Sequence, residues 1–408
     1  MSALPVRKLR TGLTGLTAAV VAAAVATTAF APAAAASSAP TTHDRTQEAI
    51  EAAVKDGVPG VVTQVRDGNG PWTGTAGVAD RRTGRERHGQ DRYRVGSITK
   101  TFVATVVLQL EAEGRLSLDD SVDKWLPGVV RGNGHDGRRI TLRQLLNHTS
   151  GVYSYTEDPG LGEKVFGPGF FKHRYDTWTP EQLVSIAMSH KPDFAPGKGW
   201  HYSNTNYVLA GMVIGKVTGR SYAHEIERRI VSPLALRATS LPGTRATMPK
   251  PGGRAYSKLS RDPKAKIHDV TELNPSMAGA AGEMVSNSAD LQRFYRVLMK
   301  GDLLPERQLK EMTTTVSVGD GAPHIRYGLG LVQQKLSCGK EIWGHSGGIH
   351  GSSSEAVTTR DASHSLALNF NGDWAGDSGA VLEAEFCGEG AEEAVKAPGA
   401  IEALRSGF

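Results

Sequence analysis

The sequence predicts an α/β (α+β) fold: one antiparallel sheet built from both chain ends, flanked by helices, with a mainly helical insertion. Two strand-like segments around a Gly-Asn-Gly turn occupy residues 60–80. Helical patterns then dominate from about residue 115 to about residue 290. Strand-like segments return only at about residues 327–372. This order of strands, helices and strands favours a single sheet that the two ends complete together.

The first 36 residues have the organisation of a secretory signal peptide. A basic head (Arg7, Lys8 and Arg10) precedes an Ala-rich apolar stretch at residues 13–30, and Ala34–Ala36 offers a small-residue cleavage site. The alternative is a membrane anchor, but the stretch is weakly hydrophobic for a span, and no later segment could cross a bilayer. We expect a secreted, extracellular protein with no stable membrane anchor.

A short linker (residues 37–44) should lead into one folded domain over residues 45–388. The domain begins with a helix at residues 46–57. Its most apolar helix, Ser97 to Glu113, should be buried because apolar residues occur almost all round it. Further helices are predicted at residues 116–128, 140–151, 179–190, 205–219 and 281–301, with a closing helix that ends at Cys387. Residues 389–408 are predicted to be a flexible tail.

Composition excludes several classes of function. The chain of 408 residues has 47 basic and 42 acidic side chains, and three of the basic ones lie in the predicted signal peptide. The mature protein is therefore almost neutral, without the basic stripe that nucleic-acid binding requires. No nucleotide-binding fingerprint and no H-E-x-x-H motif occurs, so we expect no cofactor and no metal.

Cys338 and Cys387 are the two cysteines of the chain. Two cysteines in an exported protein usually pair, and closing a loop of about 50 residues would stabilise the fold by about 4 kcal/mol in the chain-entropy model. The alternative is two buried free thiols.

The segment VGSITK places Ser97 three residues ahead of Lys100, so the two side chains share a helix face. A serine hydroxyl needs a base to become nucleophilic, and burial can lower the pKa of a lysine enough to supply one. The alternative is a capping serine and a lysine that reaches the surface. A second S-x-x-K, Ser337–Lys340, lies between strand-like segments and is predicted to be a turn.

Two further motifs favour catalysis. Tyr202-Ser203-Asn204 follows a loop and precedes a helix, where the phenol could relay a proton and the amide could orient a substrate. His345-Ser346-Gly347 lies on a late strand, where the histidine and hydroxyl could face Ser97 and the glycines could let a substrate approach. A similar triplet at residues 135–137 lies in a Gly-rich loop and is discarded.

These three motifs, in this order, resemble those of the serine penicillin-recognising hydrolases, which include penicillin-binding proteins and class C β-lactamases. Within that family the chain is most similar to secreted bacterial D-alanyl-D-alanine carboxypeptidases, from about residue 48 to residue 387. Supporting stretches are GVADRRTG, LLNHTSGVY, YSNTNYVLAGM, YGLGL and GHSGG. The resemblance implies a β-lactamase/transpeptidase-like fold and places both cysteines at the disulfide of such carboxypeptidases.

The resemblance implies a role for each motif residue. Ser97 would form an acyl-enzyme, while Lys100 and Tyr202 would move protons. Asn204 would orient the substrate amide, and His345 would support the electrostatics of the site where many relatives carry lysine. Water would then release the acyl group.

The resemblance also implies how a substrate binds. Ser346, Gly347 and Gly348 would contact it, and the backbone N–H groups of Ser97 and Gly348 would form an oxyanion hole. The implied activity is removal of terminal D-Ala from peptidoglycan stem peptides, with β-lactams as acylating inhibitors. We expect a monomer.

Two positions depart from the carboxypeptidase pattern. Such enzymes must bind a free carboxylate, for which arginine is the natural partner. Val332 occupies the position where the relatives carry arginine, and Gly348 replaces a threonine; Arg326 or Lys335 could substitute from elsewhere. An esterase, a D-amino-acid amidase or aminopeptidase, or a β-lactamase on the same scaffold is therefore the alternative.

Two interpretations from other classes can be weighed. Gly344–Gly348 spells G-x-S-x-G, the nucleophile elbow of α/β-hydrolases, but the residues that follow Ser346 do not have the pattern of the helix that this motif needs. A non-enzymatic wall-binding or penicillin-sensing module is disfavoured because all the motif residues are present together. His148, beside a predicted helix end, is interpreted as structural.

Overall fold

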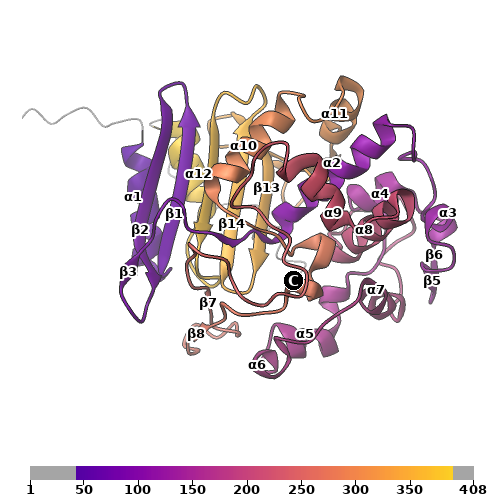
Figure 1. Ribbon diagram of the computed structural model, residues 1–408, viewed down its shortest axis with the longest axis horizontal. Helices are drawn as coiled ribbons and strands as arrows, with labels where there is room; N and C mark the ends of the chain where they lie inside the picture. Colours follow the sequence, from indigo (N-terminus) through magenta and orange to yellow (C-terminus); the bar gives the residue numbers. More distant parts are fainter. Residues whose placement is uncertain (1–42, 389–408) are drawn as a thin grey trace, which may run out of the picture. The chain divides into compact units, whose positions relative to one another are not determined.

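The computed structural model describes residues 43–388, and within them nine strands form one antiparallel sheet (Figure 1). In spatial order the strands are β10 (Val316–Ser317), β11 (Ile325–Tyr327), β12 (Val332–Lys335), β13 (Glu341–Ile349), β14 (Ser352–Thr359), β15 (Ser365–Phe370), β1 (Gly60–Asp67), β2 (Gly70–Asp80) and β3 (Arg85–Glu86). β1 pairs with β15, so both ends of the domain build the sheet, as predicted. The predicted signal peptide, most of the linker and the tail lie outside the described residues.

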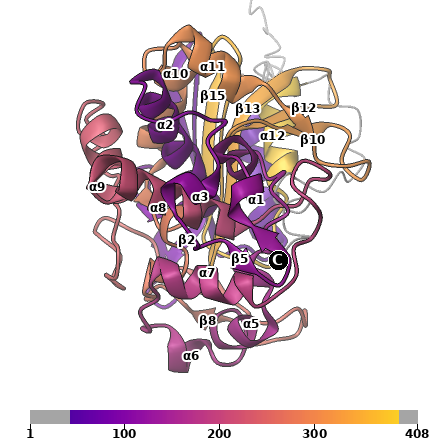
Figure 2. The same cartoon turned by 90° about the vertical axis from the view of Figure 1, so that its right-hand side faces the viewer.

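Helices cover the sheet and form the insertion (Figures 1 and 2). They are α1 (Asp44–Lys55), α2 (Thr99–Ala112), α3 (Val122–Trp125), α4 (Leu142–Leu146), α5 (Pro159–Val165), α6 (Phe170–His173), α7 (Pro180–Met188), α8 (Asn204–Thr218), α9 (Tyr222–Ile226), α10 (Ser288–Met299), α11 (Glu306–Thr313) and α12 (Ser378–Cys387). Three separate two-stranded sheets accompany the helices. They pair β4 (Tyr93–Arg94) with β9 (Val285–Ser286), β5 (Arg131–Gly132) with β6 (His135–Asp136), and β7 (Tyr256–Ser257) with β8 (His268–Asp269).

Alternation along each strand sends side chains into two separate cores. Val61 and Val65 of β1 pack with α1 and α12, whereas Val62 packs with the cluster that contains α2, α8 and α10. On β13, Ile342 faces the first core and Trp343 faces the second. The sheet therefore separates a small core from a large one.

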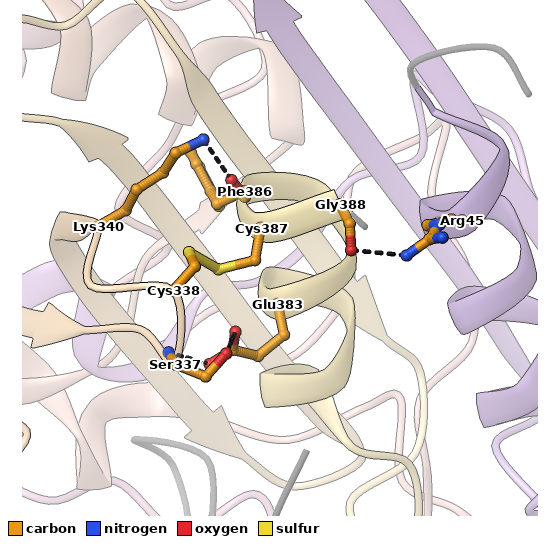
Figure 3. Close-up of a disulfide and its surroundings, with 8 residues drawn as sticks. All are labelled: Arg45, Ser337, Cys338, Lys340, Glu383, Phe386, Cys387 and Gly388. Atoms are coloured by element: carbon orange, nitrogen blue, oxygen red, sulfur yellow. Dashed lines mark hydrogen bonds between the residues drawn. A yellow bond between two sulfur atoms is a disulfide. The ribbon is translucent and has the colours of Figure 1, made fainter. Parts of the chain in front are cut away.

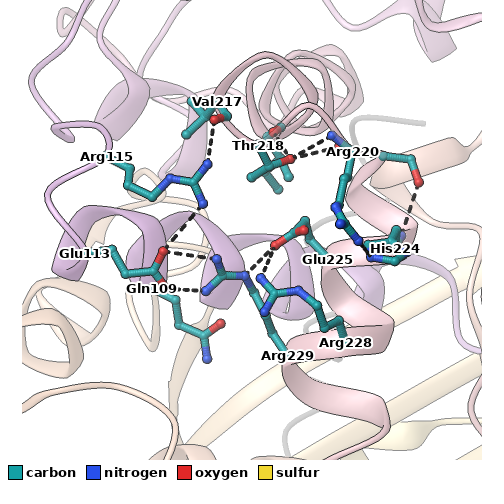
Figure 4. A network of polar contacts seen from close by, with 12 residues as sticks. Gln109, Glu113, Arg115, Val217, Thr218, Arg220, His224, Glu225, Arg228 and Arg229 are labelled. Carbon is teal, nitrogen blue, oxygen red and sulfur yellow. Dashed lines mark hydrogen bonds and ion pairs between the residues drawn. The ribbon is translucent and has the colours of Figure 1, made fainter.

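Helix α2 lies in the large core, and nearly all its side chains are buried, as its apolar composition predicts. A charged cluster anchors its C-terminal end (Figure 4). Arg229 forms ion pairs with Glu113, directly after α2, and with Glu225 of α9. Arg115 donates a hydrogen bond to the carbonyl oxygen of Val217 in α8, at 2.7 Å. These contacts fix α2 from the end opposite to Ser97.

Cys338 and Cys387 form the expected disulfide, which joins the β12–β13 turn to the end of α12 (Figure 3). Lys340 Nζ donates to the carbonyl oxygen of Phe386 at 2.6 Å, and Ser337 donates through both its backbone N–H and its hydroxyl to Glu383. The second S-x-x-K is therefore a turn, as predicted, and its serine and lysine hold α12 rather than each other.

Three local predictions need correction. Ser97 lies in a 3₁₀ turn, η1 (Gly96–Ile98), and the α-helix begins two residues later. The stretch GLGL is a connection between β11 and β12, since Gly330 has φ of 68° and leaves the extended region. Residues 352–359 form the central strand β14, for which no strand was predicted. No helix among residues 43–388 has both the length and the apolar character to span a membrane.

Candidate active site

The turn that carries Ser97 is held by close backbone packing against β13. Gly96 has φ of 51°, and a Cβ there would lie 2.8 Å from the Gly348 nitrogen. A Cβ on Gly347 would lie 1.9 Å from the Val95 carbonyl oxygen and 3.1 Å from the Ser97 nitrogen. Both positions require glycine because the strand and the turn touch directly. The sequence assigned these strand glycines to substrate access; the structure shows that Gly347 also lets β13 approach the serine.

Lys100 is fully buried and reaches three oxygens. Its Nζ lies 2.9 Å from Ser97 Oγ, 2.8 Å from Asn204 Oδ1 and 2.7 Å from the Ala281 carbonyl oxygen. Burial lowers the pKa of Lys100 well below its usual value of 10.5. A neutral amine has two N–H donors and one lone pair. In this neutral form the two N–H groups would go to Asn204 and Ala281, because a carbonyl and an amide oxygen can only accept, and the lone pair would face the Ser97 hydroxyl.

Tyr202 also contacts the serine, and it is 3% exposed. Its phenol hydrogen-bonds to Ser97, and its ring centroid lies 4.8 Å from Lys100 Nζ. Burial raises the pKa of Tyr202 above its usual value of 10. The phenol is therefore protonated at neutral pH and can act as a proton donor.

Asn204, the first residue of α8, holds the lysine. Its Oδ1 accepts from Lys100, and its Nδ2 donates to Thr156 Oγ1 at 3.1 Å. Thr156 in turn lies 2.8 Å from the hydroxyl of Ser154, which accepts the Asn204 backbone N–H. The side chain of Asn204 is thus oriented before any substrate arrives.

His345 is on the same face of β13 as Gly347, and it is 1% exposed. Its two ring nitrogens lie 2.8 Å from the Tyr327 hydroxyl and 2.6 Å from the Ser346 carbonyl oxygen. Burial, aided by Lys100, lowers the pKa of His345 to about 3. The ring is therefore neutral at physiological pH, whereas a lysine at this position would bring a charge.

One edge of β13 is unpaired beside the serine turn. β12 pairs with β13 from Glu341 to Gly344, and from His345 to Ile349 the pairing within the described chain is with β14. Along β13, Ser346 and Gly348 lie on the sheet face opposite to that of His345. In the pairing with β14, Ser346 is the register partner of Glu355. An extended substrate can add its main chain to such an edge.

Sequence reasoning missed several contributors to the site. Ala281 acts through a backbone carbonyl, for which no side-chain motif exists. Thr156 and Tyr327 lie far from the motifs in sequence, and His148 was assigned only a structural role although its Nε2 lies 3.3 Å from the Tyr327 hydroxyl. His135, which was discarded, lies in β6, and its ring nitrogens form no hydrogen bond with these residues of the described chain.

The nucleophile-elbow alternative loses support from this geometry. Ser346 lies within strand β13, and a turn and strand β14 follow it, so the helix that a nucleophile elbow needs is missing at this point of the described chain. Among residues 43–388, no group of three or more His, Cys, Asp or Glu side chains is placed to hold a metal ion.

Residues 46–384 match the family model described as Beta-lactamase. The chain belongs to this family. Its fold is the β-lactamase/transpeptidase fold, and it is a serine hydrolase of the family.

Three relatives show where the chain lies within the family. A D-stereospecific amidohydrolase from Streptomyces sp. is 68% identical, with a TM-score of 0.82 over 85% of this chain and 99% of that chain. The D-amino acid amidase from Ochrobactrum anthropi SV3, complexed with L-phenylalanine, is 29% identical, with a TM-score of 0.72 over 84% of this chain and 98% of that chain. Penicillin-binding protein 4* from Bacillus subtilis (strain 168) is 29% identical over 282 residues, which cover 65% of this chain and 57% of that protein. The chain thus spans less than two thirds of this curated relative.

Proposed function

We propose that this protein hydrolyses amides of D-amino acids through an acyl-enzyme on Ser97. The observation that carries the proposal is the apolar environment of Val332, where a carboxypeptidase of the predicted kind would have an arginine. The similarity to a D-stereospecific amidohydrolase and to a D-amino acid amidase supports the same substrate class. The alternative considered from the sequence is therefore preferred to the D-Ala-D-Ala carboxypeptidase.

Val332 borders the catalytic tyrosine and is 4% exposed. It packs in a cluster with Tyr202, Tyr327, Ala322 and Ile325. A carboxylate buried beside such a surface would lose its hydration without gaining a charged partner, which costs several kcal/mol. A neutral carboxamide meets no such penalty, so the site suits a substrate whose leaving group is ammonia or an uncharged amine.

Neither candidate substitute for the missing arginine reaches this cluster. The Arg326 guanidinium donates to the Thr315 hydroxyl at 2.8 Å and to the Thr315 carbonyl oxygen at 3.0 Å. Arg326 also alternates with Tyr327 on β11, so it lies on the opposite face from the site. Lys335 is exposed at the far end of β12, where its register partner on β13 is Glu341.

The contacts support a proton route for the reaction. The Ser97 hydroxyl transfers its proton to the Lys100 lone pair as Oγ attacks the amide carbon. The Tyr202 phenol, which bonds to Ser97, then protonates the departing nitrogen, and the phenol regains a proton from Lys100. Water attacks the acyl-enzyme by the same route in reverse. The N–H groups of Ser97 and Gly348 would stabilise the oxyanion, and the second N–H of Asn204 Nδ2 would bind the substrate.

A D-amino-acid amide also carries an α-ammonium group, for which Glu157 is the candidate partner. Glu157 follows Thr156, which contacts Asn204, and its Oε1 lies 3.3 Å from Nε2 of His201, next to Tyr202. This contact is an ion pair when His201 is protonated, and the buried Oε1 accepts no hydrogen bond from the described residues. Burial raises the pKa of Glu157. An ammonium group would supply a hydrogen-bond donor to Oε1.

The proposal is tested by ammonia release from D-phenylalaninamide, with L-phenylalaninamide and an N-acylated peptide ending in D-Ala-D-Ala as competing substrates. Purified protein should release ammonia from the D-amide, and Ser97→Ala should abolish the reaction. Release of D-alanine from the peptide with a higher kcat/KM than the D-amide would restore the carboxypeptidase. Activity that survives in Ser97→Ala would overturn the acyl-serine mechanism itself.

We also propose that the protein is secreted. The Cys338–Cys387 disulfide supports this because disulfides persist mainly in oxidising compartments. Fractionation of the producing cells should place the protein in the medium, without residues 1–36.

A further inference from the structure

A line of three uncharged side chains connects the segment of Tyr202 and Asn204 with strand β13. His148 Nε2 lies 3.3 Å from the Tyr327 hydroxyl, and that hydroxyl lies 2.8 Å from His345 Nε2. The exposed fractions of the three side chains are 1% or less. Water therefore does not compete for these hydrogen bonds.

The position of the proton on His345 follows from its neighbours. Nδ1 lies 2.6 Å from the Ser346 carbonyl oxygen, which can only accept a hydrogen bond. Nδ1 must therefore carry the proton, and Nε2 must be an acceptor. The Tyr327 hydroxyl also contacts the Tyr207 hydroxyl, which itself donates to the Leu146 carbonyl oxygen at 2.7 Å. Because Nε2 of His345 has no proton of its own, the Tyr327 proton goes to Nε2.

The position of the proton on His148 is fixed in the same way, with the opposite result. Its Nδ1 lies 3.1 Å from the backbone nitrogen of Ser203 and 3.2 Å from Asn206 Nδ2. Both of these are donors, so Nδ1 accepts and Nε2 carries the proton. His148 thus donates to the Tyr327 oxygen, and every hydrogen bond of the line points from the Ser203 backbone N–H towards the Ser346 carbonyl oxygen.

We propose that His148 and Tyr327 are positioning residues that hold His345 as its Nδ1–H tautomer and brace the Tyr202–Asn204 segment against β13. The two ends of the line, Ser203 and Ser346, lie in the two segments that would flank the substrate. A change in either histidine tautomer would place two donors or two acceptors against each other. The line therefore fits only one tautomer of each histidine.

Charge gives the arrangement a chemical consequence. The titratable groups that face the two histidines are Lys100, Tyr202, Tyr207, His201 and Tyr327 itself. Burial and the nearby Lys100 lower the pKa of both histidines, that of His345 to about 3. A positive charge on His345 would depress the pKa of Lys100 further and weaken it as a base. A neutral His345 avoids this competition for the Ser97 proton.

The first test reads the tautomers directly, by NMR of the protein with ¹⁵N-labelled histidine. His345 should show a protonated Nδ1 and a bare Nε2, His148 should show the reverse, and neither ring should titrate between about pH 5 and pH 9. His345→Gln and His148→Asn spectra assign the signals. A proton on His345 Nε2, or titration of either ring in that range, overturns the proposal. This NMR measurement needs no substrate, so its outcome is independent of the proposed amidase activity. The role of the two positioning residues in catalysis rests on the proposed acyl-serine chemistry.

The second test separates positioning from a merely structural role. Tyr327→Phe removes the donor to His345 Nε2, so kcat should fall about tenfold with KM nearly unchanged, and the His345 pKa should rise. His148→Gln keeps an N–H donor towards the Tyr327 hydroxyl. His148→Asn keeps only an oxygen that accepts the Ser203 backbone N–H. The His148→Gln variant should therefore retain more activity than His148→Asn. The proposal is overturned if Tyr327→Phe lowers only the melting temperature and leaves kcat, the histidine tautomers and the pH–rate profile as in the wild type.

Discussion

The amine of Lys100 lies 2.9 Å from the hydroxyl of Ser97, and its two other partners, Asn204 Oδ1 and the Ala281 carbonyl oxygen, can only accept hydrogen bonds. The two acceptor oxygens thus match the two N–H groups of a neutral lysine, and the Ser97 hydroxyl matches its lone pair. Burial favours the neutral form as well. Geometry and solvation therefore both support the proposed role of Lys100 as the base that activates Ser97.

A base of this kind makes acylation depend on pH. The folded pKa of Lys100 lies well below 10.5, so kcat/KM for an uncharged ester substrate should rise with pH through that lowered value and then level off. Lys100→Arg, which stays protonated, should lose about 10²- to 10⁴-fold in acylation rate across this range. A pH–rate profile of both proteins checks this. An acylation rate of the Lys100→Arg variant within about tenfold of the wild type would contradict the assignment.

The same shift has a consequence for stability. Between its folded pKa and 10.5, Lys100 binds fewer protons in the folded than in the unfolded protein. Its burial therefore costs stability in this window, and the cost decreases as pH rises towards 10.5. Relative to Lys100→Met, the wild type should gain melting temperature as pH rises, and a difference that is constant with pH would contradict a neutral buried lysine.

Motifs predicted the side chains of the site but not what holds them. Ser97, Lys100, Tyr202 and Asn204 meet as expected because each lies at the start of a helix or in the loop before one. Ala281 could not be found, since a backbone carbonyl leaves no mark on residue type. Tyr327, expected only as part of a strand, supplies a hydroxyl whose role depends on two histidines remote in sequence.

The fold was predictable where a turn signal or a continuous apolar pattern is strong. β1 and β2 lie on either side of the Gly-Asn-Gly turn that predicted them, and α2 follows its apolar sequence. β14 was missed because SSSEAVTT is rich in polar residues although it lies buried in the centre of the sheet. Buried partners compensate these side chains: the Ser352 hydroxyl donates to the Arg94 carbonyl oxygen at 2.7 Å, and Ser378 donates to Glu355 at 3.0 Å.

Replacing Val332 by arginine should shift the substrate preference. The guanidinium would offer a partner for a free C-terminal carboxylate, so Val332→Arg should lower KM for a D-Ala-D-Ala peptide by about tenfold or more. Val332→Met, similar in length but uncharged, is the matched control and should leave that KM unchanged. Because position 332 is buried among apolar side chains, the arginine should also lower the melting temperature. An unchanged or higher KM in a folded arginine variant would show that this position does not set carboxylate binding.

Removing the charge of Glu157 should weaken binding of substrates with a free α-ammonium group. Glu157→Gln should raise KM for D-phenylalaninamide by about tenfold, the loss expected for one charge-assisted hydrogen bond, and leave KM for its N-acetyl derivative unchanged. Asp193→Asn is the matched control because Asp193 Oδ2 also contacts His201, at 2.8 Å, without adjoining Thr156. Equal effects of Glu157→Gln on both substrates would point to a structural role for the carboxylate.

The disulfide should contribute to stability without affecting catalysis. Cys338 and Cys387 are 49 residues apart, and closing a loop of that length stabilises a fold by about 4 kcal/mol in the chain-entropy model. The bond joins the β12–β13 turn to α12, and β13 reaches the site only at its other end, from His345 to Gly348. The variant with both cysteines replaced by alanine should therefore unfold at lower denaturant concentration but keep its kcat at temperatures where it is folded.

Ser337→Ala tests the same junction without opening the loop: it removes one exposed hydrogen bond to Glu383 and should cost about 1 kcal/mol of folding free energy or less. Equal losses in the two variants would mean that local contacts, rather than loop closure, hold α12 to the turn, and a fall in kcat of the folded double variant would show that strain at this junction is transmitted along β13 to the serine.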